Sequence, residues 1–104
     1  MESFSFESSS GTHSYDVPAA IVGVVSSGNL EVLIEKSDKD ICKCEIITSE
    51  VGYKQIWKCV IDDFFAKYQL TRMNIYVNDS GASPSVVSLR LEQAIEKLKG
   101  NTYD

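Results

Sequence analysis

The segment AAIVGVVSSGNLEVLIE, residues 19–35, contains two strand patterns joined by a short polar turn. Residues 19–25 are nearly all apolar and rich in β-branched side chains, which is typical of a central strand. In residues 30–35 apolar and acidic side chains alternate, which indicates a strand with one buried face. The apolar face consists of Leu30, Val32 and Ile34.

The turn between these strands is Ser26-Ser27-Gly28-Asn29. Glycine and asparagine tolerate positive φ, so the pattern predicts a tight hairpin. A hydroxyl at such a tip is exposed, and its small neighbours let the active site of another protein approach. Many ordinary turns have the same properties, so the turn alone does not establish a modification site.

The rest of the chain predicts two more strands and two helices. Residues 41–48 alternate imperfectly as a third strand, with Cys42 and Cys44 on its apolar face. Residues 53–68 change to helical spacing, and their apolar side chains predict one stripe that packs in the core: Tyr53, Ile56, Trp57, Val60, Phe64 and Tyr68. Residues 73–77 return to alternation as a fourth strand.

A second helix is expected to begin at Ser83-Pro84, where a capping hydroxyl precedes proline at the first helical position. Gly100 is expected to end it. The predicted fold is therefore α+β: a mainly antiparallel four-stranded sheet with both helices on one face, in the order β-β-β-α-β-α. We expect a flexible leader over residues 1–16, one domain over 17–100 and a tail over 101–104.

Charge and cysteine content restrict the function. The formal net charge of −5 argues against nucleic acids and anionic membranes as partners. An acidic surface suits a small protein that visits larger partners with basic entrances, although it also simply maintains solubility. Three cysteines and no signal sequence predict reduced thiols in the cytoplasm.

No catalytic or metal-binding cluster is apparent. The single histidine, His13, lies in the polar leader, away from any predicted nucleophile. Cys42 and Cys44 share a strand face with Ile46, where cysteine packs as a small hydrophobe. We therefore expect no catalytic residue and no metal site.

Several segments together resemble the acyl carrier (delta) subunit of biotin-independent malonate decarboxylase. They are MESFSFE at 1–7, VGVVSSGNLEVL at 22–33, DSGASPSVV at 79–87 and LRLEQ at 89–93. The resemblance runs from the leader to the last helix, and the motifs occur in the family's order and spacing.

The resemblance implies a covalent prosthetic group, 2'-(5''-phosphoribosyl)-3'-dephospho-CoA, linked by a phosphodiester to a serine of the Ser-Gly turn. The matching position is Ser27, followed by Gly28. The family usually has Gly-Ser-Gly-Asp here, whereas this chain has Ser26 and Asn29 at the outer positions, so Ser26 is a rival attachment site.

The implied role is that of a non-catalytic carrier. An acyl transferase subunit exchanges acetyl for malonyl on the thiol of the arm, and decarboxylase subunits then remove carbon dioxide. A prosthetic-group transferase and a malonyl-carrier transferase are the other implied partners. The carrier contributes tethering, which raises the local concentration of the acyl group.

The chain also contains a serine in a second acyl-carrier-like segment, and two other functions fit the sequence. Common acyl carriers attach their arm at Asp-Ser-Leu, but Gly81 follows Asp79-Ser80 here, so residues 79–83 are interpreted as a turn and helix cap. The related citrate lyase carrier (gamma) subunit is one alternative function. An unmodified protein–protein docking module is the other.

Overall fold

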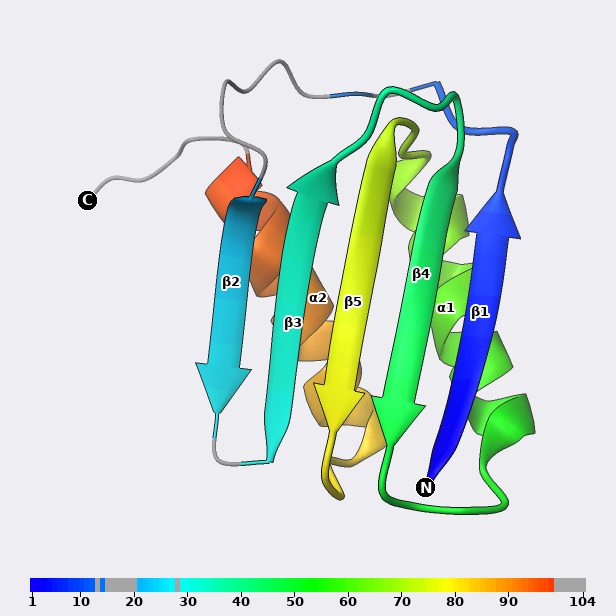
Figure 1. Ribbon diagram of the computed structural model, residues 1–104, viewed down its shortest axis with the longest axis vertical. Helices are drawn as coiled ribbons and strands as arrows, with labels where there is room; N and C mark the ends of the chain where they lie inside the picture. The colour runs from blue at the N-terminus through cyan, green and yellow to red at the C-terminus, as the bar shows by residue number, and fades with distance from the viewer. Residues whose placement is uncertain (13, 15–20, 28, 99–104) are drawn as a thin grey trace.

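The computed structural model describes residues 1–12, 14, 21–27 and 29–98 of the chain. One layer is a five-stranded sheet in the order β1-β4-β5-β3-β2, and both helices form a second layer behind it (Figure 1). The elements follow the chain as β1 (Glu2–Ser8), β2 (Ile21–Ser27), β3 (Leu30–Lys36), β4 (Cys42–Thr48), α1 (Lys54–Tyr68), β5 (Met73–Asp79) and α2 (Pro84–Leu98).

The α+β class and the two helices on one face are confirmed, as is the order of elements from β2 to α2. The sheet is mainly antiparallel, as expected: β1 with β4, β2 with β3, and β3 with β5. One pairing, β4 with β5, is parallel. It is parallel because α1 lies between these strands in the chain and carries the backbone across the sheet, which is the usual connection for parallel neighbours.

The strand count of four is wrong, because Glu2–Ser8 forms a fifth strand inside the predicted leader. This strand pairs with β4 along its whole length, from Glu2 opposite Thr48 to Ser8 opposite Cys42. Phe4 and Phe6 are partly buried and pack against the core. Two aromatic side chains on one face therefore hold a strand whose serines made the segment look unstructured.

The core lies between the sheet and the helices. Alternate residues of β3, β4 and β5 are buried, and each helix adds an apolar stripe. The stripe of α1 is Trp57, Ile61 and Phe64, and that of α2 includes Val87, Leu91, Ala94 and Ile95. The predicted buried face of β4 is confirmed, since Cys42, Cys44 and Ile46 are fully buried.

Both helices begin at the same end of the sheet (Figure 1), but their N-termini are capped differently. Tyr53 occupies the N-cap of α1 and makes no side-chain capping hydrogen bond. At α2 the Val86 amide donates to the Ser83 hydroxyl at 3.4 Å, which confirms the predicted cap. Gly100, the predicted end of α2, lies outside the described residues, and the division into leader, domain and tail is otherwise untested.

Candidate functional site

The turn of the hairpin that contains Ser27 lies at one end of the sheet, where β2 ends and β3 begins. Ser27 is the last residue of β2 and pairs with Leu30, the first residue of β3. Ser26 pairs with Glu31, one position further from the tip. Gly28 lies outside the described residues. The backbone therefore has the predicted hairpin connectivity, with Ser27 closer to the tip than Ser26.

The hairpin tip is held against the loop that follows β5. The Ser80 amide donates a 2.9 Å hydrogen bond to the Asn29 carbonyl oxygen. Leu30 pairs with Asp79 in the adjacent antiparallel ladder. The turn next to Ser27 and the Asp79–Ser83 loop are thus neighbours in space, although they are far apart in sequence.

The Asp79 side chain forms hydrogen bonds to two other segments at this end of the sheet. The side chain is buried, with 3% of the residue exposed. One carboxylate oxygen accepts a 2.8 Å hydrogen bond from the Thr48 hydroxyl, and the other accepts a 2.9 Å bond from the Ala82 amide. A buried carboxylate needs such partners. Residues 79–83 therefore act as a turn and a helix cap, in agreement with the sequence interpretation.

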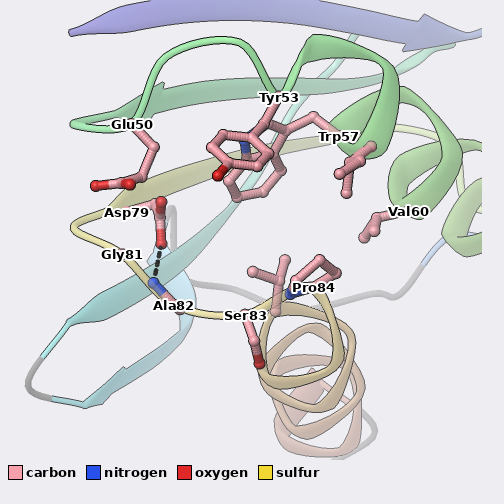
Figure 2. Close-up of a pocket in the computed structure, with 11 residues that line it drawn as sticks. Glu50, Tyr53, Trp57, Val60, Asp79, Gly81, Ala82, Ser83 and Pro84 are labelled. Carbon is pink, nitrogen blue, oxygen red and sulfur yellow. Dashed lines mark hydrogen bonds between the residues drawn. The ribbon is translucent and has the colours of Figure 1, made fainter.

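A pocket of about 220 Å³ lies between the start of α1 and the start of α2 (Figure 2). The α1 side is aromatic and aliphatic, and the opposite side is formed by the loop after β5 and the first turn of α2. Two carboxylates, Glu50 and Asp79, lie at one side of it. The lining is Glu50, Tyr53, Ile56, Trp57, Val60, Asp79, Gly81, Ala82, Ser83, Pro84 and Val87.

The sequence did not predict this pocket, because Tyr53, Ile56 and Val60 were expected to share one core stripe with Trp57. Trp57 does belong to the core, with 5% exposed, but Tyr53 is 47% exposed and Ile56 42% exposed. Tyr53, Ile56 and Val60 follow one another at helical spacing and line the pocket. A second apolar stripe beside the core stripe was the signal that could have revealed the pocket.

The cysteines fall into two environments. Cys42 and Cys44 are buried and Cys59 is exposed. Burial raises the pKa of Cys42 from 9.0 to about 12, and burial also raises the pKa of Cys44. Both buried thiols are therefore neutral packing groups at physiological pH.

Within the described part of the chain, no cluster of three or more His, Cys, Asp and Glu side chains is arranged to hold a metal ion. His13 lies outside the described residues. None of the described helices has the length and hydropathy needed to cross a bilayer.

The family model described as "Malonate decarboxylase delta subunit (MdcD)" matches residues 18–98, which include the hairpin, the pocket and both helices. The chain belongs to this family. The match covers most of the chain and contains Ser27, Gly28 and the Asp79–Ser83 loop.

Curated relatives of the family are named "Malonate decarboxylase acyl carrier protein". The chain is 42% identical over 101 residues to the protein of Acinetobacter calcoaceticus, covering 96% of this chain and 99% of the relative. It is 52% identical over 82 residues to the protein of Xanthomonas campestris pv. campestris (strain B100), covering 78% of each.

A solved structure supports the family assignment. The fold is similar to a chain in the crystal structure of a Pseudomonas malonate decarboxylase hetero-tetramer in complex with malonate. The TM-score is 0.76 and the sequence identity 36%, and the match covers 94% of this chain and 99% of that chain. The match therefore spans nearly the whole length of both chains.

Proposed function

We propose that this chain carries acetyl and malonyl groups as thioesters for a malonate decarboxylase, on a prosthetic arm attached to Ser27. The observation that carries the proposal is the family match over residues 18–98, within which Ser27 ends the β2 strand at a hairpin tip. The proposed arm is 2'-(5''-phosphoribosyl)-3'-dephospho-CoA, joined through a phosphodiester to the serine hydroxyl.

The position of Ser27 fits a covalent attachment site. Ser27 stands at the end of a strand pair rather than within it, since Leu30, its partner, begins β3. The hydrogen bond from the Ser80 amide to the Asn29 carbonyl ties the turn to the body of the domain. An attachment point at the end of a strand pair that is tied to the domain lets a modifying enzyme and later partners act on it without unfolding the domain.

This chain acts by tethering the acyl group rather than by acid–base catalysis. When bound, the arm supplies a terminal thiol, and a thioester stabilises negative charge on the carbon next to its carbonyl. The hairpin fixes the origin of the arm, and the sheet and helices behind it keep that origin in place. Tethering of this kind raises the effective concentration of the acyl group at each partner active site.

The proposed partners are the acyl transferase and decarboxylase subunits, together with the prosthetic-group transferase and the malonyl-carrier transferase. The net charge of −5 favours basic entrances on these partners. The proposed compartment is the cytoplasm, where free thiols such as the exposed Cys59 stay reduced.

Reconstitution of the complete complex tests this function. The complex assembled with the loaded chain should release carbon dioxide from malonate and should not cleave citrate to acetate and oxaloacetate. Ser27→Ala should abolish turnover, while Ser26→Ala, the matched neighbouring substitution, should retain it. Turnover of malonate by the Ser27→Ala complex would contradict the proposal and favour an unmodified docking role.

A further inference from the structure

We propose that the pocket between α1 and α2 receives the adenine ring of the arm, so that the carrier docks the base and leaves the thiol end free. This inference rests on the function proposed above. It concerns the pocket-lining residues of this chain, chiefly Tyr53, Trp57 and Glu50, which the carrier role itself does not require.

The pocket lies close to the turn that bears the arm. Asn29, two residues beyond Ser27, accepts a hydrogen bond from Ser80, and the residues on both sides of Ser80 line the pocket. In the proposed arm the adenine follows the serine phosphate and two riboses. The thiol is separated from that adenosine by a diphosphate and the pantetheine chain. The base is therefore the part of the arm that reaches a pocket beside its own attachment turn.

The aromatic and apolar lining of the pocket suits a nucleobase. Tyr53, 47% exposed, overhangs the pocket, and the indole of Trp57 forms its inner wall (Figure 2). An exposed aromatic ring such as that of Tyr53 is a usual stacking partner of nucleobases. Val60 and Pro84 supply the apolar surface on the remaining sides.

The negative charge of the pocket wall favours the neutral base over the anionic parts of the arm. The Glu50 and Asp79 carboxylates on the pocket wall repel the diphosphate and a malonyl carboxylate. Adenine is neutral, and its exocyclic amine is a donor. Asp79 already binds Thr48 and Ala82. The Glu50 side chain is exposed and, among the described residues, accepts only a 3.3 Å hydrogen bond from the Ser49 hydroxyl, so it retains acceptor capacity for that amine.

The volume of the pocket also favours a single base over the whole arm. A cavity of about 220 Å³ is below the roughly 300–1,000 Å³ of pockets that enclose a whole drug-sized ligand. It holds one heterocycle, and it cannot enclose the entire arm. Docking the base alone leaves the pantetheine chain in solvent, as a carrier that serves several active sites requires.

The experiment is nuclear magnetic resonance on the loaded, isotope-labelled chain, whose loading at Ser27 is first established by intact mass and peptide mapping. We expect nuclear Overhauser contacts from the adenine protons to the ring of Trp57, the single tryptophan of the chain, and to the methyl groups of Val60. Tyr53→Ala should lower pocket occupancy by roughly tenfold, within the range for losing one stacking partner.

The matched control is Tyr76→Ala, because Tyr76 lies on the opposite face of the sheet, between the buried residues Ile75 and Val77. It should leave the adenine contacts unchanged. Tyr53 is exposed, so its loss should not unfold the chain, and the amide spectrum checks this directly.

A loaded chain whose adenine contacts no pocket residue would overturn the docking inference and leave the carrier function intact. An active complex whose Ser27 carries no arm would overturn both.

Discussion

The Thr48 hydroxyl donates a 2.8 Å hydrogen bond to the Asp79 carboxylate, and both residues are buried at the paired ends of the parallel strands β4 and β5. The second carboxylate oxygen of Asp79 accepts from the Ala82 amide, just before α2 begins. The Asp79 backbone carbonyl accepts from Ser49 at 3.0 Å. One side chain therefore joins the ends of two strands to the start of a helix, beside the proposed attachment turn.

Thr48→Val should destabilise the protein by about 2 kcal/mol, because it leaves a buried carboxylate oxygen without its hydroxyl partner while preserving side-chain shape. Urea unfolding measures this change. Ser49→Ala is the matched control: the Ser49 hydroxyl is exposed and contacts only Glu50 among the bonds described, so its removal should change stability by less than about 0.5 kcal/mol. Equal effects of the two substitutions would contradict the role assigned to Asp79.

The fifth strand should contribute to stability. Phe4→Ala and Phe6→Ala should each cost about 2 kcal/mol, roughly half the cost for a fully buried phenylalanine, since both rings are partly buried against the core. Ser5→Ala, which changes an exposed residue between them, should be nearly neutral. If both phenylalanine variants unfold like the wild-type chain in urea, β1 is not part of the cooperative fold.

The thiols should differ in reactivity. A maleimide added to the native chain at pH 7.5 should modify Cys59 rapidly and should leave Cys42 and Cys44 unmodified, because both are buried and their pKa values are raised by burial. In denaturant all three should react. Mass spectrometry counts the adducts, and Cys59→Ser should reduce the native count to zero. Fast native labelling of Cys42 would contradict the packing described.

Stability should fall as the pH rises above 9. Burial raises the pKa of Cys42 from 9.0 to about 12, so between these values the unfolded chain releases a proton that the folded chain retains. Each such thiol lowers the free energy of unfolding by up to about 1.4 kcal/mol per pH unit. Below pH 9 both states hold the proton and this contribution is constant.

Urea titrations from pH 8 to 11 test that slope, with Cys42→Ala compared against Cys59→Ala. The first substitution should flatten the alkaline loss of stability and the second, which removes an exposed thiol, should not. The comparison of slopes separates Cys42 from lysines and tyrosines that titrate in the same range. Equal slopes in the two variants would contradict the assignment.

Much of the fold follows from local pattern. The alternation of Leu30, Val32 and Ile34 in β3 predicted a strand that the structure confirms almost to the residue. The Ser83-Pro84 pair predicted the start of α2 correctly, because capping depends on neighbouring residues alone.

What the sequence did not predict depends on contacts between distant segments. The strand β1 forms because its Phe4 and Phe6 side chains meet a core contributed mainly by later residues, while Ser3 and Ser5 face away. The pocket forms because the start of α1 lies across from the loop after β5. No local sequence pattern specifies that tertiary arrangement. Tyr53 therefore looked like one more core residue, and its exposure became evident only in the folded chain.

The most direct test of the carrier function is intact mass spectrometry of the chain produced with its modifying enzymes, followed by peptide mapping. We predict a mass gain equal to the phosphodiester-linked arm on the peptide that contains Ser27, lost in Ser27→Ala and retained in Ser26→Ala. An unchanged mass in a complex that still decarboxylates malonate would contradict it.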